Sequence, residues 1–166
     1  KKDRFPGIDA LKALAGLGAL ALCVLSVLDP ANAVLFWALV AVSGLLGVLL
    51  EPTTVVAKAW EQVSLVGQRA FWEPQHVLVT GAGPIGLLAA LLGRQRGLDV
   101  HVLDRMTSGP KPELARALGA TYHSGSVREI GFEPDAIVEC TGVGQVIADA
   151  IQAVGASGIV CLTGVG

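Results

Sequence analysis

The chain has 166 residues and a formal net charge of −2, which allows one ordinary domain and a little more and gives no reason to expect nucleic acid as a partner. Hydrophobic residues make up 52% of the chain and charged residues only 16%, a composition that is unusual for a soluble protein. The excess is local, because Asp29 is the only charged residue between Ala13 and Leu50.

Two uncharged runs occupy this N-terminal region. Ala13–Leu28 has 16 residues and Ala31–Leu50 has 20, with the turn signal Asp29–Pro30 between them. A bilayer is spanned by about 20 apolar residues, so the second run is long enough to span it. The first run is long enough only if the two residues before it are included. We therefore predict a hydrophobic helical hairpin over residues 1–50 that enters a lipid bilayer through residues 11–50.

The charges that flank this hairpin predict its orientation. Lys1, Lys2 and Arg4 precede it, and Lys58 and Arg69 follow it. The positive-inside rule then places both ends in the cytoplasm, so the protein would be membrane-associated with its remaining domain on the cytoplasmic side. Three other interpretations stay open: a buried helical pair in a cytoplasmic protein, a signal peptide, and a fused leader with no role shared with the rest.

A second domain is predicted to begin at the end of the hydrophobic block. Glu51–Pro52 closes that block, and apolar residues at three- and four-residue steps predict a helix over Thr53–Arg69. We therefore divide the chain into residues 1–50 and residues 51–166.

The most informative motif lies in the second domain. His76–Thr80 is typical of a buried strand, and it is followed by a glycine-rich turn and a helix predicted over Pro84–Arg96. The glycines have the G-x-G-x-x-G spacing, in which each has a mechanical role. We expect Gly81 to permit the tight turn, Gly83 to let the backbone approach a pyrophosphate, and Gly86 to let helix and strand pack closely.

A second strand is predicted over Asp99–Asp104, and its last residue is an acid. Asp104 lies 18 residues beyond Gly86, where a carboxylate can accept hydrogen bonds from ribose hydroxyls. The helix N-terminus that precedes it would offer unpaired N–H groups to the phosphates. Together these features predict that the turn binds a dinucleotide.

The remaining elements alternate between helix and strand. The pattern predicts helices over residues 113–118 and 145–154 and strands over residues 121–123, 135–140 and 157–163. Such alternation is typical of an α/β fold, a Rossmann-type doubly wound parallel sheet. Because a full unit has a sixth strand, we expect a sheet that is truncated after strand five or that exchanges an edge with a partner, as in a homo-oligomer.

The cysteines and histidines suggest no metal centre of their own. Cys140 and Cys161 lie in apolar strand-like runs and are expected to be buried thiols. His76, His101 and His123 lack ligand spacing and are expected to be surface or packing residues.

From about residue 47 the chain resembles the zinc-containing medium-chain dehydrogenases, and most of all the cofactor-binding half of their glucose 1-dehydrogenase branch. The resemblance covers about residues 47–166, in the expected order. It is carried by residues 47–52 (Gly-Val-Leu-Leu-Glu-Pro), 77–86 with the G-x-G-P-I-G form, 103–105, 118–122, 139–142 and 162–166.

This resemblance implies an oxidoreductase that passes a hydride between a sugar or alcohol carbon and a nicotinamide cofactor. It implies that the pyrophosphate is contacted by Ala82, Gly83, Pro84 and Ile85, and that Asp104 and Arg105 meet the adenosine ribose. The residues that it assigns to the nicotinamide end are Thr141, Gly142, Thr163, Gly164 and Val165. Asp104 favours NAD because its charge would repel a 2′-phosphate, although Arg105 could accept that phosphate and allow NADP.

The resemblance also places Glu51 at the catalytic zinc of the family. The other zinc ligands belong to a catalytic domain that this chain lacks, so we expect zinc only if such a domain is supplied elsewhere, for example by a separate catalytic subunit. The leading interpretation is thus an NAD(P)-binding domain that is not catalytically complete alone. The alternatives are a membrane-tethered NAD(H)-sensing regulatory subunit and a non-catalytic remnant.

Overall fold

The computed structural model describes residues 31–69 and 72–164, with side chains from Trp37 onward. The chain divides into two compact units, residues 1–49 and residues 50–166. The first arm of the predicted hairpin, Ala13–Leu28, lies outside the described residues. The second arm is helical, but it is part of a much longer helix than predicted.

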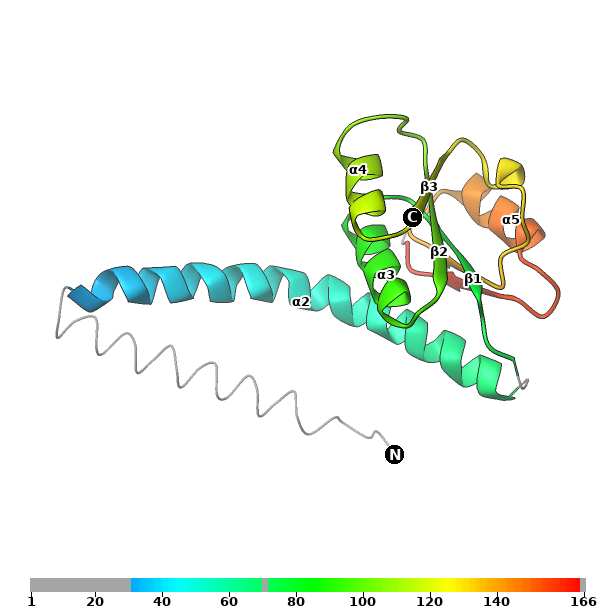
Figure 1. The fold of residues 1–166 in the computed structure, drawn as a ribbon. Coiled ribbons are helices and arrows are strands. Elements are labelled where there is room, and N and C mark those ends of the chain that lie inside the picture. The colour runs from blue at the N-terminus through cyan, green and yellow to red at the C-terminus, as the bar shows by residue number, and fades with distance from the viewer. Residues whose placement is uncertain (1–30, 70–71, 165–166) are drawn as a thin grey trace. The chain divides into compact units, whose positions relative to one another are not determined.

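This helix, α2, runs without interruption over Ala31–Arg69 (Figure 1). The predicted break at Glu51–Pro52 is therefore wrong, because Pro52 lies inside the helix. Proline removes one intrahelical hydrogen bond, but packing of the following turns outweighs that loss. Val56, Trp60 and Val63 are buried against the sheet, and the Trp60 indole N–H donates to the carbonyl of Ala89 at 3.2 Å.

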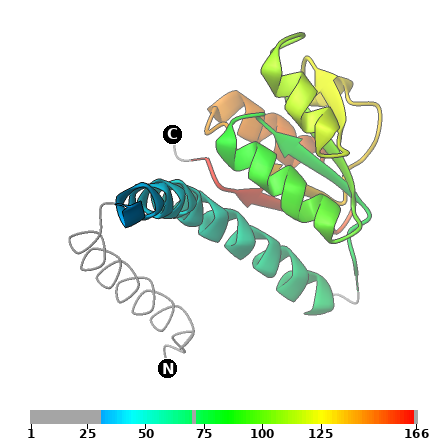
Figure 2. The same cartoon turned by 60° about the vertical axis from the view of Figure 1, so that its left-hand side comes forward.

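The second unit contains one five-stranded parallel sheet. Its strands are β1 (His76–Thr80), β2 (Asp99–Asp104), β3 (Thr121–Ser124), β4 (Ala136–Glu139) and β5 (Ile159–Leu162), in the order β3-β2-β1-β4-β5. Figure 2 shows β3 and β5 at opposite edges of this sheet. The order and the parallel pairing confirm the predicted Rossmann-type sheet.

Helices connect the strands on both sides of the sheet. They are α3 (Pro84–Gln95), α4 (Pro110–Ala117), the short 3₁₀ helix η1 (Val127–Glu129) and α5 (Gly144–Ala153). Predicted α4 began at Glu113, but the helix begins three residues earlier at Pro110, because proline suits the first helical turn, where its missing N–H costs nothing. The short turn η1 was not predicted.

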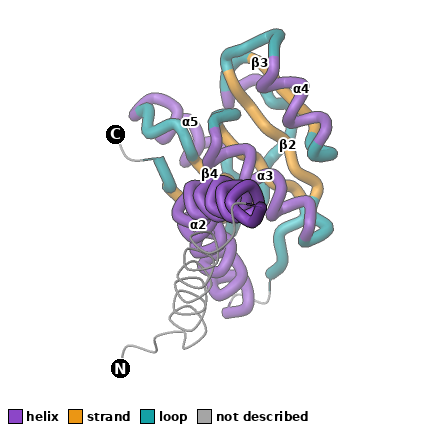
Figure 3. The backbone as a smooth tube through the Cα atoms, turned by 90° about the vertical axis from the view of Figure 1, so that its left-hand side faces the viewer, coloured by secondary structure: helices purple, strands orange, loops and turns teal. Residues whose placement is uncertain are grey.

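Helices lie on both faces of the sheet (Figures 1 and 3), and an apolar core lies beneath each layer of helices. On one face, the second half of α2 packs with α3 and α4 on alternate strand residues such as Val77, Val79 and Val100. On the other face, α5 and η1 cover Leu78, Leu103 and Ile137. Because both faces are covered, β1 and β4 are buried along almost their whole length, which fits their continuous apolar runs Val-Leu-Val and Ala-Ile-Val.

The strand order fixes where a ligand can bind. From β1 the chain goes to β2 on one side, and after β3 it returns to β4 on the other side of β1. In open α/β sheets, the crevice at such a reversal, beyond the carboxyl ends of the strands, is the binding site. The glycine turn after β1 lies at this position.

The histidines gather on one face near the β2–β3 edge. The His101 and His123 rings stack with centroids 5.0 Å apart, and His101 Nδ1 lies 2.7 Å from His123 Nε2. Phe132 packs 4.3 Å from His101, and the Asp99 carboxylate lies 3.3 Å from its other ring nitrogen. Burial lowers the pKa of His123, and the charge of His101 lowers it further.

This cluster predicts a stability loss in mild acid. The unfolded chain takes a proton on His123 near the ordinary histidine pKa of about 6.5, whereas the folded chain resists protonation, so stability is present above that pH and is lost as the pH falls through the folded pKa. We expect the free energy of unfolding, measured by urea denaturation, to fall between pH 7.5 and pH 5. His123→Gln should flatten this slope, and equal slopes in the two proteins would contradict the assignment.

Candidate dinucleotide-binding site

The glycine turn has a distinct geometry at each of its three glycines. Gly81 has φ +92°, which side chains rarely adopt, and its N–H donates to the carbonyl of Leu103 at 2.7 Å. A Cβ at Gly86 would lie 1.8 Å from the carbonyl oxygen of Gly81, so no side chain fits there. A Cβ at Gly83 would meet no atom within 4 Å. Gly81 thus takes the tight turn, Gly86 the close packing, and Gly83 a position that is open above the turn.

The N-terminus of α3 faces this open approach. Gly83 is the residue before the helix, no side chain caps it, and Pro84 occupies the first turn. The N–H groups of a first helical turn have no intrahelical acceptor and lie at the positive end of the helix dipole. An anionic diphosphate is the kind of ligand that such a terminus binds.

Asp104 connects the end of β2 to the glycine turn. Its Oδ2 accepts a hydrogen bond from the Ala82 N–H at 2.8 Å and a charged one from Lys111 Nζ at 3.0 Å, and its Oδ1 accepts from the Met106 N–H at 3.1 Å. Burial raises the pKa of Asp104, but these three donors outweigh burial and the pKa is lowered overall. The carboxylate is therefore ionised and points to the turn, with its side chain 11% exposed.

A cavity of about 500 Å³ lies beside these groups. It is bounded by the glycine turn, the end of β2, the turn around η1, the loop after β4 and the start of α5. Its lining includes Gly81, Gly83, Asp104, Arg105, Lys111, Cys140, Thr141 and Val143. Five of the predicted cofactor residues thus meet in one cavity.

Cys140 also lines this cavity, and burial raises the pKa of its thiol to about 11, so this thiol stays protonated at neutral pH.

The predicted residues at the nicotinamide end are joined by Glu139, which the sequence analysis did not select. Its side chain is fully buried at the carboxyl end of β4. Oε1 accepts from the N–H of Thr141 at 2.7 Å and from the Thr141 hydroxyl, and Oε2 accepts from the Gly142 N–H at 3.2 Å. The Glu139 carbonyl accepts from the N–H groups of Thr163 and Gly164 at 2.8 and 3.0 Å. Val165 lies outside the described residues.

Glu51 does not join this site in the structure. It is an exposed residue of α2, where its backbone carbonyl accepts from the Thr54 hydroxyl at 2.6 Å. Within residues 31–69 and 72–164, no group of three or more His, Cys, Asp or Glu side chains is arranged to hold a metal ion. The described residues therefore do not fit zinc by themselves.

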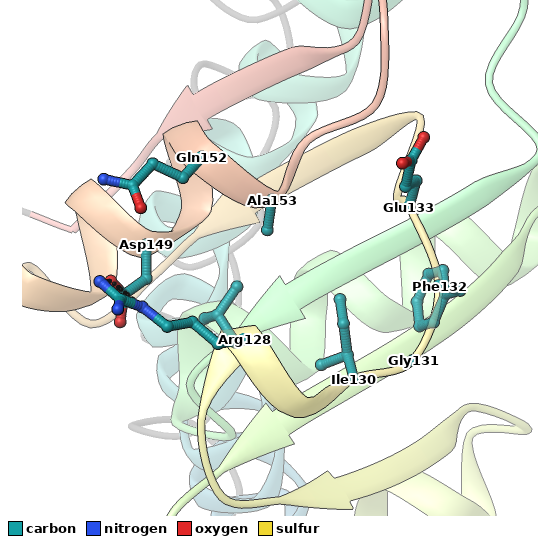
Figure 4. A pocket seen from close by; sticks show the side chains of 9 residues that line it. Arg128, Ile130, Gly131, Phe132, Glu133, Asp149, Gln152 and Ala153 are labelled. Carbon is teal, nitrogen blue, oxygen red and sulfur yellow. Dashed lines mark hydrogen bonds and ion pairs between the residues drawn. The ribbon is translucent and has the colours of Figure 1, made fainter.

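A second, shallower pocket of about 480 Å³ lies on the α5 face of the sheet (Figure 4). Arg128 reaches from η1 to Asp149 of α5, where Nη2 and Oδ1 are 2.6 Å apart. Ile130 and Phe132 line the other part of this pocket. None of the predicted cofactor residues lines it.

The fold defines a class of protein: an α/β domain of the Rossmann type. Residues 44–166 match the family model described as glucose dehydrogenase C-terminus. The chain belongs to this family, which confirms the resemblance to the glucose dehydrogenase branch.

Relatives in this family align with about 70% of the chain. Glucose 1-dehydrogenase of Methanocella arvoryzae is 42% identical in an alignment of 126 positions that covers 70% of this chain and 34% of the relative. Glucose 1-dehydrogenase 2 of Vulcanisaeta moutnovskia is 40% identical over 71% of this chain and 34% of its own. The chain thus spans about a third of the length of the curated relatives it matches.

Solved structures agree with the fold. Glucose dehydrogenase from Haloferax mediterranei is similar with a TM-score of 0.65 and 28% identity, over 72% of this chain and 37% of that chain. The complex of that enzyme with NADP, zinc and gluconolactone has a TM-score of 0.62 and 27% identity, over 69% and 35% of the two chains.

A pair of glycine substitutions separates binding from folding. Gly86→Ala should destabilise the fold by about 3 kcal/mol, because its Cβ overlaps the Gly81 carbonyl. Gly83→Ala should change stability by less than about 1 kcal/mol but raise the Kd for NADH at least about tenfold, because its Cβ enters the open approach. Thermal unfolding and NADH fluorescence titration check the pair. Unchanged NADH binding in Gly83→Ala would contradict a pyrophosphate site at this turn.

Proposed function

We propose that residues 51–166 form the NAD(P)-binding domain of a glucose- or alcohol-dehydrogenase-like oxidoreductase. One observation carries this proposal above the others: the Asp104 carboxylate is fixed to the Ala82 N–H beside an uncapped helix N-terminus. The Ala82 N–H is taken by Asp104, so the N–H groups offered to a diphosphate would be those of the uncapped helix N-terminus, with an acid at the tip of the neighbouring strand. The printed names of the relatives as glucose 1-dehydrogenases support the same class.

Residues that line the cavity and residues of the loops beside it have separate roles in this proposal. Ala82, Gly83, Pro84 and Ile85 would hold the pyrophosphate at the start of α3. Asp104 and Arg105 would hold the adenosine ribose, and the loops at Thr141–Gly142 and Thr163–Val165 would hold the nicotinamide end. When bound, the nicotinamide ring supplies a carbon that accepts or donates a hydride.

The charges around Asp104 support the use of both NAD and NADP. A lone carboxylate would repel a 2′-phosphate, but Lys111 pairs with it at 3.0 Å and Arg105 lines the same cavity. These two cations and one anion leave a net positive charge beside the proposed ribose position. A structure of the Haloferax mediterranei enzyme contains NADP, which supports the same proposal.

We expect the full chain to bind both NADH and NADPH in fluorescence titrations. Lys111→Ala should weaken the binding of NADPH about tenfold relative to the binding of NADH, because a charge-assisted contact to the 2′-phosphate is lost. Lys58→Ala is the matched control, since Lys58 is an exposed lysine of α2 that pairs with Glu61.

The outcomes separate the competing functions. Equal losses for the two cofactors in Lys111→Ala would contradict the role of Lys111. Absence of binding at millimolar cofactor would favour the non-catalytic remnant. Oxidation of glucose by this chain alone, with NAD or NADP, would overturn the proposal that turnover needs a catalytic domain from elsewhere.

The catalytic half is proposed to come from outside the described residues. Hydride transfer needs a substrate pocket and, in the zinc-type dehydrogenases, a metal that polarises the substrate oxygen. Glu51 would be one side chain that this chain offers to such a site, and the remaining ligands would come from a further domain or a separate catalytic subunit. The outer edge of β5 pairs with no other described strand, which supports a homo-oligomer as one way of completing the sheet.

We further propose that the apolar part of α2 inserts into a lipid bilayer, with the nucleotide-binding domain in the cytoplasm. By length and composition, one described helix could cross a membrane, over Trp37–Arg69. From Trp37 to Leu50 every residue is exposed, and none is charged. A core helix of a soluble protein would be buried, so this exposure supports a lipid environment. It is also the observation that favours the alternative of a membrane-tethered NAD(H)-sensing subunit.

A charge in the apolar segment tests this proposal. We expect the full chain to float with phospholipid vesicles in a density gradient and Val42→Lys to reduce the floating fraction, because a lysine near the centre of a span costs about 2.5–3.5 kcal/mol. Ile151→Lys is the control, since Ile151 is 59% exposed on α5 and Val42 is 53% exposed on α2. A full chain that stays monodisperse without detergent and does not float would contradict the proposal that α2 inserts into a bilayer.

A further inference from the structure

We propose that Glu139 is the positioning residue of the nicotinamide half of the site, and that it holds two loops in the shape that accepts the nicotinamide end of the cofactor. This inference rests on the proposed NAD(P) binding. It assigns a function to a residue whose side chain does not line the cavity and would not itself contact the ligand.

The first step of the argument is burial. Glu139 ends β4 in the middle of the sheet, and its side chain is 0% exposed. A buried carboxylate is costly unless donors surround it. In the described part of the chain no lysine, arginine or histidine forms an ion pair with Glu139. Its carboxyl oxygens are satisfied by N–H and O–H groups instead, and an apolar residue would be the simpler choice for packing alone.

The second step is the origin of those donors. The Thr80 hydroxyl at the end of β1 lies 3.4 Å from Oε1, and the Thr141 N–H and Gly142 N–H donate at 2.7 and 3.2 Å. Gly142 has φ +68°, so the loop turns back on itself to bring both N–H groups to one carboxylate. The side chain thus fixes the path of the loop after β4 relative to the end of β1.

The third step is the loop after β5. The Glu139 carbonyl accepts from the Thr163 N–H and hydroxyl, both at 2.8 Å, and from the Gly164 N–H at 3.0 Å. A Cβ at Gly164 would lie 2.3 Å from the Gly142 nitrogen and 3.1 Å from Glu139 Oε2. The two loops are therefore in direct contact, and one residue binds both of them.

Apart from the long contact with the Thr80 hydroxyl at the end of β1, these contacts lie in the two loops assigned to the nicotinamide end. The pyrophosphate and ribose positions are formed by the glycine turn and Asp104, whose hydrogen bonds do not include Glu139. Loss of the carboxylate should therefore loosen one half of the site and leave the other half intact. A residue that only supported the fold would affect both halves together.

The experiment compares two ligands that share the adenosine diphosphate and differ at the nicotinamide. NADH is titrated by fluorescence and ADP-ribose, which lacks the nicotinamide ring, by calorimetry, with the full chain and with Glu139→Gln. The glutamine keeps the shape but turns an N–H₂ group toward an N–H donor. We expect the Kd for NADH to rise about tenfold and the Kd for ADP-ribose to change less than about twofold.

Asp104→Asn is the control, because it should raise the Kd for NADH and the Kd for ADP-ribose alike. If Glu139→Gln does not fold, Thr141→Val and Thr141→Ser decide the question: valine removes the hydroxyl that donates to Glu139, and serine restores it. Selective loss of NADH with valine and recovery with serine support the proposal. Parallel changes in both ligands, or no change, overturn it. A parent chain that binds neither ligand overturns the proposed function as well.

Discussion

The hydrogen bond from the Ala82 N–H to the Asp104 carboxylate is the constraint on which the site depends. It joins the turn after β1 to the end of β2, and the bond from the Gly81 N–H to the Leu103 carbonyl reinforces this connection. The turn cannot collapse onto the strand ends, because Gly86 already packs at the limit of contact with Gly81. The N-terminus of α3 is therefore held open in a fixed direction, as an anion site requires.

A similar arrangement stands on the other side of β1. There Glu139 collects the loops after β4 and β5, as Asp104 collects the turn after β1. Two carboxylates, at the carboxyl ends of the strands on either side of β1, thus accept hydrogen bonds from loop N–H groups, and the backbone carbonyl of Glu139 accepts those from the loop after β5. The cavity between them is shaped by acids that are already satisfied by the protein.

The sequence was most informative where local chemistry and tertiary packing agree. β1 and β2 have the predicted bounds because β1 carries the apolar run Val-Leu-Val and β2 carries its valines and leucine between two bounding aspartates, which suits strands in the interior of a covered sheet. Pro52 suggests a helix boundary that the structure does not have. The packing of Trp60 and Val63 outweighs the lost backbone hydrogen bond, and no local sequence signal shows that packing. Glu139 was overlooked for the same reason. The available signal was an acid that follows the buried run Ala-Ile-Val and precedes Cys-Thr-Gly. Its hydrogen-bond partners lie at the end of β1 and in its own loop, so the sequence alone does not show them.

Pro52 has one further consequence. It provides no N–H to the carbonyl of Val48, so α2 has one fewer backbone bond at the position where its fully exposed turns give way to those that pack on the sheet. The two compact units of the chain also divide at this point, between Leu49 and Leu50. Helices bend most readily at proline, so this turn is where bending of α2 would be concentrated.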